Sequence, residues 1–212
     1  MRIKKMLSEF LKQNRGIVGI EAAIVLIAFV VIAASLAYVV INMGFYSSQK
    51  AKSTIDRGIQ EATSALTLDG FIVGYTNANS KLQYFAIPLK LAVGQDQVDM
   101  AANTTLVAVL GTTFSLTDIY SSAASSIETN LTKLMTDTTP GPNATCYIFN
   151  DDSDSVIEQN EKAYLVINLG TDYPLVSYNK VKIEVRPSRG AALMIQREIP
   201  GGLQASSEVD LG

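Results

Sequence analysis

The chain has 212 residues, of which 48% are apolar and 17% charged, and its formal net charge is −3. It contains no His and a single cysteine, Cys146, which excludes a Ser-His-Asp triad, any metal site that needs imidazole and an internal disulfide. The acidic balance argues against nucleic acid as the main partner. No nucleophile–base pair can be built from the remaining spacings, so we expect a protein that is not an enzyme.

The charges are distributed unevenly along the chain. Residues 1–16 carry a net charge of +4, whereas residues 17–212 carry −7. No charged residue occurs in residues 22–49, a length sufficient to cross a bilayer core of ~30 Å as a helix. Basic residues ahead of such a span favour a cytoplasmic N-terminus, with the rest of the chain outside. The sequence therefore predicts a membrane-inserted or secreted protein.

Three interpretations of this N-terminus are open. An ordinary secretory signal would be cut at a small-residue site, which Ser35-Leu36-Ala37 could provide, so that the chain would start at Tyr38. A permanent single-pass anchor needs only the length of the span. The third interpretation rests on residues 14–21, NRGIVGIE, which resemble the class III signal peptide of type IV pilins. That resemblance implies cleavage after Arg15 and Gly16, so that Ile17 begins the mature chain and the apolar helix is kept.

The apolar pattern continues past the length that a membrane requires. Beyond Gln49, apolar residues recur at spacings of three and four, which places them on one face of a helix. A helix over residues 20–66 is about 70 Å long, and a lone anchor has no use for an apolar stripe beyond the bilayer. We therefore expect helices that pack against copies of themselves. The expected packing positions are Ile24, Ile27, Val31, Ala34, Ile55, Ile59, Ala62 and Leu66.

Glu21 has two interpretations at the head of this helix. As an acid in the first turn, it is stabilised by the helix dipole by ~0.3–1 kcal/mol. As a carboxylate packed away from water, it needs a cationic partner. The new α-amine of Ile17 on a neighbouring subunit would provide that partner and fix the register between helices, and we expect Glu21 to be an assembly residue.

Five strings of the sequence are similar to archaellins, the archaeal flagellins, which belong with the type IV pilin-like proteins. They are residues 19–31 (GIEAAIVLIAFVV), 38–44 (YVVINMG), 61–70 (EATSALTLDG), 183–193 (IEVRPSRGAAL) and 197–200 (REIP). The resemblance implies a structural subunit of the archaellum, a rotating filament for swimming. It further implies a helical homopolymer on the cell exterior, a prepilin-like peptidase, an assembly platform with its motor, and a membrane-held stage before assembly.

Two alternatives to a swimming filament are weighed against these strings. An adhesive type IV-like pilus subunit would be built in the same way, and only the archaellin-like strings favour swimming over attachment. A membrane-anchored surface module that never polymerises would leave the apolar stripe between Ala51 and Leu66 without a purpose.

The expected fold class is α+β, with a leader over 1–16, a helix over 17–66 and a β-rich outer domain over 67–212. Short β-prone runs recur at 71–75, 82–93, 104–110, 146–149, 163–169, 181–185 and 193–199, which predicts an antiparallel sandwich or barrel similar to the immunoglobulin-like outer domain of archaellins. Residues 114–135 have helical spacing at Ile119, Ala123, Ile127, Leu131 and Leu134, so we expect a helix or a long decorated loop there.

Three sequons occur, at Asn103, Asn130 and Asn143. An extracytoplasmic domain makes each a candidate for N-glycosylation, and we expect at least one to be used. Asn143 adjoins a Pro-Gly-Pro turn and is expected to be the most accessible.

The acidic run of Asp151, Asp152 and Asp154, followed by Glu158 and Glu161, offers oxygen ligands of the kind that Ca²⁺ prefers. It lacks the order of ligands and the glycine of an EF-hand, so the leading expectation is a solvated acidic turn without a cofactor. Cys146 begins an apolar run and is expected to be a buried small hydrophobe.

Overall fold

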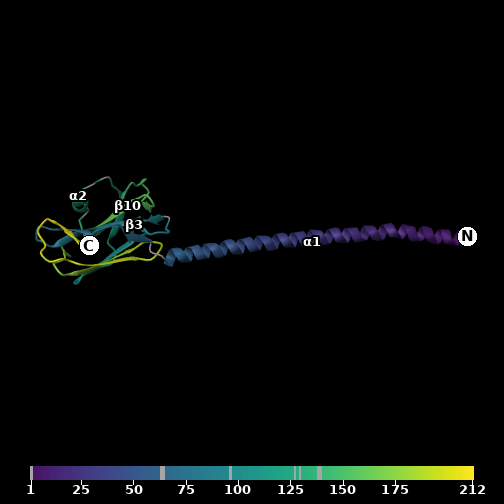
Figure 1. The fold of residues 1–212 in the computed structure, drawn as a ribbon, viewed down its shortest axis with the longest axis horizontal. Helices are drawn as coiled ribbons and strands as arrows, with labels where there is room; N and C mark the ends of the chain where they lie inside the picture. The colour runs from purple at the N-terminus through teal and green to yellow at the C-terminus, as the bar shows by residue number, and fades with distance from the viewer. Residues whose placement is uncertain (1, 63–64, 96, 127, 129, 138–139) are drawn as a thin grey trace. The chain divides into compact units, whose positions relative to one another are not determined.

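The computed structural model describes residues 2–62, 65–95, 97–126, 128, 130–137 and 140–212; side chains of the helix are described from Gly19 on, except at residue 60. The chain divides into two compact units at Asp56. One unit is a long helix and the other is a β-rich outer domain (Figure 1). The expected order of a long N-terminal helix followed by a mostly antiparallel β domain is confirmed.

Helix α1 runs without interruption over Arg2–Ala62, 61 residues or about 92 Å at the rise of an α-helix. It contains no Pro, and its Ala and Lys residues favour helix, although its frequent Ile and Val residues favour it less. The helix includes the backbone of the expected leader and ends earlier than predicted. Residues 63 and 64 lie outside the described residues.

Leu66 was predicted to pack on the helix, and this prediction is wrong. Leu66 begins strand β1 (Leu66–Leu68), which pairs antiparallel with β3, placing Leu66 opposite Leu91. Its side chain is 1% exposed within the core of the outer domain. The residue therefore belongs to the outer domain because non-local strand pairing overrides the helical spacing.

The outer domain contains two main sheets and a two-stranded ribbon. The larger sheet has, in spatial order, β13 (Glu208–Asp210), β2 (Val73–Thr76), β3 (Leu82–Leu91), β10 (Lys162–Asn168), β8 (Asn143–Phe149) and β7 (Tyr120–Ser125), with β1 also paired to β3. The smaller sheet has β12 (Leu193–Glu198), β11 (Lys180–Arg186), β5 (Leu106–Leu110) and β6 (Ser115–Leu116). The ribbon pairs β4 (Gln97–Asp99) with β9 (Val156–Glu158).

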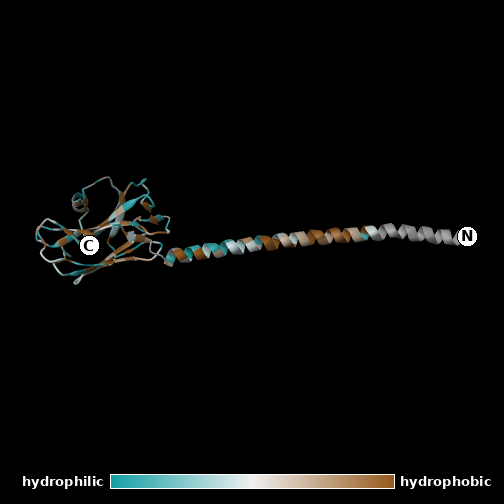
Figure 2. Ribbon diagram, in the orientation of Figure 1, coloured by the Kyte–Doolittle hydropathy of each residue, from teal (hydrophilic) through white to brown (hydrophobic). Residues whose placement is uncertain are grey.

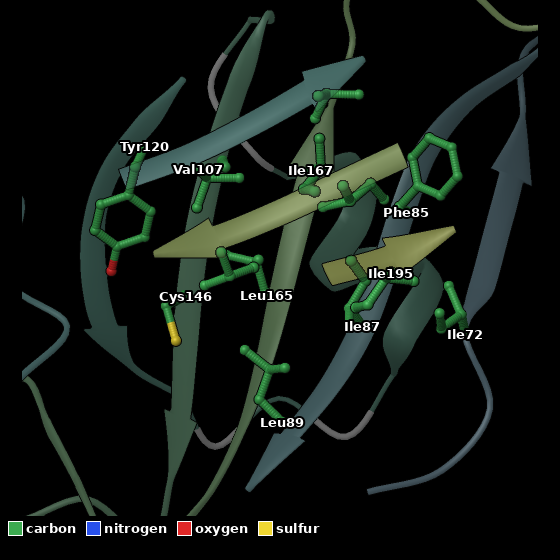
Figure 3. Packing of buried hydrophobic residues seen from close by; sticks show 14 of the residues in the cluster. Ile72, Phe85, Ile87, Leu89, Val107, Tyr120, Cys146, Leu165, Ile167 and Ile195 are labelled. Atoms are coloured by element: carbon green, nitrogen blue, oxygen red, sulfur yellow. The ribbon is translucent and has the colours of Figure 1, made fainter. Parts of the chain in front are cut away.

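The two sheets enclose one hydrophobic core. Phe85 from β3 and Leu165 from β10 meet Val107 and Ile183 from the smaller sheet in a single cluster of buried side chains. Figure 3 labels Phe85, Leu165 and Val107 among the buried side chains of this cluster. The strict alternation predicted for β11 is observed, since its odd-numbered residues are buried and its even-numbered ones are not. The sandwich is confirmed.

The segment 114–135 contains strands as well as a helix. Strand β7 pairs in parallel with β8 and carries Ala123, so the predicted helical spacing fails there. The helix present is short, α2 (Leu131–Thr136), and Ile127 lies outside the described residues. Leu134 and Met135 of α2 pack against Ala86 of β3 and Val166 of β10, and so cover the outer face of the larger sheet.

Candidate assembly helix and surface sites

The apolar side chains of α1 are uncovered in the single chain. Ile24, Ile27, Val31, Ile55 and Ile59 are each more than half exposed. The other two expected packing positions on the helix, Ala34 and Ala62, are also exposed. Figure 2 shows the apolar colouring concentrated along the middle of the helix. Because exposed apolar surface of this extent is unfavourable in water, the helix requires either lipid or other protein around it.

One helix among the described residues is long and apolar enough to cross a membrane, over Gly19–Ile59. Its uncharged part, residues 22–49, is about 42 Å long, which exceeds a hydrocarbon core of ~30 Å. Between residues 24 and 41 the one strongly polar side chain is Ser35, and it is satisfied locally, because its hydroxyl lies 2.9 Å from the carbonyl oxygen of Val31. This part of the helix is therefore compatible with an environment that contains no water.

The residues of the predicted cleavage motif lie on this helix. The backbone of Arg15, Gly16 and Ile17 belongs to α1, and their side chains lie outside the described residues. Glu21 is exposed on α1, and none of the ion pairs among the described residues includes it. A carboxylate that faces an apolar surrounding would gain from a cation supplied by another chain.

Two lysines form ion pairs with Asp69 at the start of the outer domain. Asp69, directly after β1, lies 2.6 Å from the Lys162 amine and 2.8 Å from the Lys90 amine. Its side chain is 16% exposed. These two ammonium groups, Lys162 first, lower the pKa of the Asp69 carboxyl. The ion pairs join β1 to β3 and β10, and thus connect the region after the helix to the centre of the larger sheet.

Three carboxylates converge beside β9, and they are not the three that the sequence indicated. Oxygens of Asp151, Asp152 and Glu161 lie within 4.8 Å of one another. Asp154 does not join them, because its carboxylate accepts a hydrogen bond of 2.8 Å from the Val156 amide and caps that turn. Glu161 is the third carboxylate of the cluster instead, because the chain turns back after β9. The spacing of acidic residues in the sequence does not predict this turn.

The electrostatics of this cluster favour an added positive charge. Glu161 is 8% exposed, and burial is the main reason that its pKa is raised, with the negative charge of Asp151 adding to the effect. The Oδ1 atom of Asp151 is buried without a hydrogen-bond partner among the described residues. Oxygen ligands of this type fit a divalent cation such as Ca²⁺.

The three sequons differ in accessibility. Asn103 and Asn130 are exposed. Asn130 is also the N-cap of α2, where its Oδ1 atom accepts a hydrogen bond from the Lys133 amide at 3.2 Å, and this leaves the amide nitrogen for modification. Asn143 is 9% exposed at the start of β8 and lies opposite Asn168 of β10. The prediction that Asn143 is the most accessible sequon is therefore wrong.

Cys146 lies in β8 and is fully buried in the core. Burial raises the pKa of its thiol to about 12. The thiol is therefore protonated at neutral pH and unreactive, as expected of a structural cysteine.

An exposed apolar helix joined to a β sandwich with its own core defines a helix-anchored β-domain protein. The archaeal-type flagellin family matches residues 16–197, and the chain belongs to this family. The protein named "Probable flagellin 1" of Aeropyrum pernix is 42% identical over 206 residues, covering 95% of this chain and 100% of that protein.

Two solved structures share the architecture. The archaeal flagellum of Methanospirillum hungatei strain JF1 is similar with a TM-score of 0.54 and 26% identity, covering 91% of this chain and 98% of that chain. The archaeal flagellin FlaB1 of Methanocaldococcus jannaschii has a TM-score of 0.58 at 17% identity, covering 70% of this chain and 97% of that chain, which shows the fold alone.

Proposed function

We propose that the chain is a structural subunit of the archaeal flagellum filament and polymerises through α1. The observation that carries this proposal is the combination of a helix whose apolar side chains are exposed with a domain whose core is already closed without it. No described side chain of α1 belongs to the core clusters of the outer domain, so the apolar surface of the helix is available for contacts between copies. Membership of the archaeal-type flagellin family supports a swimming filament rather than an adhesive pilus.

The precursor is held in the membrane by α1 before assembly. A prepilin-like peptidase removes residues 1–16 between Gly16 and Ile17, and the assembly platform lifts the mature subunit out of the bilayer. The apolar side chains then exchange lipid for neighbouring helices. The α-amine of Ile17 on one subunit pairs with Glu21 on another, which offsets the cost of burying a carboxylate and fixes the helix register.

The role of this subunit is mechanical, and it performs no chemistry. The packed helices transmit the torque of the motor, and the outer domains form the outer sheath of the filament. Glycans on Asn103 or Asn130 cover that outer surface. A Ca²⁺ ion held by Asp151, Asp152 and Glu161 neutralises the carboxylates that burial brings together.

The N-terminal peptide mass of protein from sheared cell-surface filaments tests the proposal. A mature chain that starts at Ile17, in material that pellets as filaments, is the expected result. An intact Met1 start found only in the membrane fraction would refute polymerisation and leave a single-pass anchor. A start at Tyr38 would identify an ordinary secreted domain.

A further inference from the structure

The outward face of the smaller sheet gathers exposed apolar side chains. Leu106 and Leu110 of β5 are 46% and 50% exposed, and Met194 of β12 is 59% exposed. The strand register places Leu110 and Gln196 on either side of Lys182, in one row across three strands. Large apolar side chains grouped on a polar sheet face are characteristic of an interaction surface.

Tyr178 extends this surface beyond the strands. The side chain is 72% exposed and borders a hollow of about 450 Å³ together with Leu110, Lys182 and Gln196. Its backbone has φ of 66°, a conformation that is costly for a bulky residue. The hydroxyl lies against Gly201, where an added Cβ would come within 2.3 Å of it. The fold thus holds an aromatic ring at the edge of the apolar face.

The same face is basic in a domain that is otherwise acidic. The charged side chains that β11 and β12 turn outward are Lys180, Lys182 and Arg186 against Glu184 and Glu198, a net charge of +1, whereas residues 67–179 carry −8. None of the ion pairs among the described residues includes Lys180 or Lys182, while Arg186 pairs with Glu184 on its own strand. The two lysines are therefore available to carboxylates on another molecule.

A complementary acidic surface exists elsewhere on the domain. Residues 151–161 contain five carboxylates and no basic residue, and Asp152, Asp154 and Glu158 are exposed. A bound divalent cation would leave this segment negative. In Figure 1 the green segment around residue 155 lies at the top of the domain, whereas the yellow-green strands β11 and β12 run along its lower margin. The two surfaces therefore do not contact each other within one chain.

We propose that the outward face of β5, β11 and β12 docks on the acidic segment 151–161 of a neighbouring copy in the filament. This inference rests on the proposed function. The contact joins two different surfaces, so it is heterologous and repeats from copy to copy, as a helical filament requires. Docking two basic faces on each other would place like charges together, which disfavours a closed dimer. The apolar side chains supply buried area, and the lysines fix the orientation.

Site-directed cross-linking in filaments tests this contact. Gln196→Cys lies in the centre of the basic face and Gln159→Cys lies in the acidic segment; both positions are exposed and uncharged, so the charges of both surfaces are retained. Gln204→Cys, also exposed but outside both surfaces, is the matched control. The buried Cys146 does not react. Cells would produce two variants together, and sheared filaments would be treated with a short bismaleimide linker.

The expected result is a covalent dimer when Gln196→Cys and Gln159→Cys are combined. Neither variant alone, nor Gln196→Cys combined with Gln204→Cys, should give this dimer. Intact filaments without the dimer would overturn the proposed contact while leaving the proposed function in place. An equal yield of dimer from Gln196→Cys alone would indicate an isologous contact and also overturn it. Absence of filaments from the unmodified chain would refute the proposed function and the contact with it.

Discussion

Leu66 and Ile59 are both apolar residues on the predicted stripe, yet the structure gives them different roles. Leu66 is 1% exposed in the outer-domain core, and Ile59 is 57% exposed on α1. Truncating a fully buried leucine to alanine costs roughly 2–5 kcal/mol of unfolding free energy. In a domain of this size each kcal/mol lowers the Tm by about 2–4 °C. We therefore expect Leu66→Ala to lower the Tm of the outer domain by about 4–20 °C.

Ile59→Ala is the matched variant and should have the opposite pattern of effects. The Tm of the outer domain should not change, because Ile59 is outside its core cluster. Filament yield should fall, since each subunit loses about 1.5–3 kcal/mol of the helix burial that assembly provides. Leu66→Ala should leave the helix–helix contacts intact. It should lower the filament yield only as far as it lowers the fraction of subunits whose outer domain is folded.

Differential scanning calorimetry of the full chain in detergent micelles measures the first effect, and quantitation of sheared filaments measures the second. Micelles cover the helix, so the transition reports the outer domain. Equal losses of Tm in the two variants, or an unchanged Tm in Leu66→Ala, would refute the assignment of Leu66 to the domain core.

Three further predictions concern the outer domain. Asp69 has a lowered pKa, so its ion pairs stabilise the domain fully above the ordinary carboxyl pKa of ~3.9, and this stabilisation is lost as the pH falls through the folded-state pKa. Asp69→Asn should lower the free energy of unfolding in urea by about 1 kcal/mol at pH 7. A difference between the two proteins that is undiminished at pH 2 would contradict this. Peptide mass spectrometry of filaments should find glycans on Asn103 or Asn130, and a glycan on the buried Asn143 would show the burial to be wrong. Ca²⁺ at a hundredfold excess over its Kd should stabilise the domain by about 2.7 kcal/mol, and Glu161→Gln should reduce this gain, whereas an equal gain in both proteins would exclude Glu161 as a ligand.

Local patterns predicted the elements that are long or strongly periodic. Residues 22–49 contain no charge and form helix as predicted. The alternation over 181–185 predicted strand β11, and the apolar residues over 163–169 predicted strand β10. One face of β10 is covered by the core and the other by α2. In α1 and β11 the side-chain period and the burial follow directly from the local sequence, whereas the burial of Val166 in β10 also depends on the distant helix α2.

Contacts between distant parts of the chain explain the failures. Leu66 follows Ala62 at a helical spacing, but its strand partner Leu91 is 25 residues away. Ala123 has helical spacing too, and a parallel pairing with Cys146 makes it part of a strand. The turn before Asn143 suggested exposure, while pairing across to β10 buries it. No local pattern contains these partners, because strand pairing is a non-local interaction.

The same principle applies to the acidic cluster. Asp154 and Glu161 are equally acidic in the sequence, and only the return of the chain after β9 decides which one reaches Asp151. The sequence therefore indicated the acidic segment, and only the structure shows which of its carboxylates come together.

The exposed apolar surface of α1 has a consequence for how a filament grows. A helix with this surface has no stable state in water, so subunits cannot accumulate in solution at either side of the membrane. Under the proposed function, unassembled subunits accumulate in the membrane, and their concentration is a number of molecules per unit of membrane area. The rate of elongation should then depend on lateral diffusion toward the base of the filament, and a detached filament should be unable to lengthen at its far end.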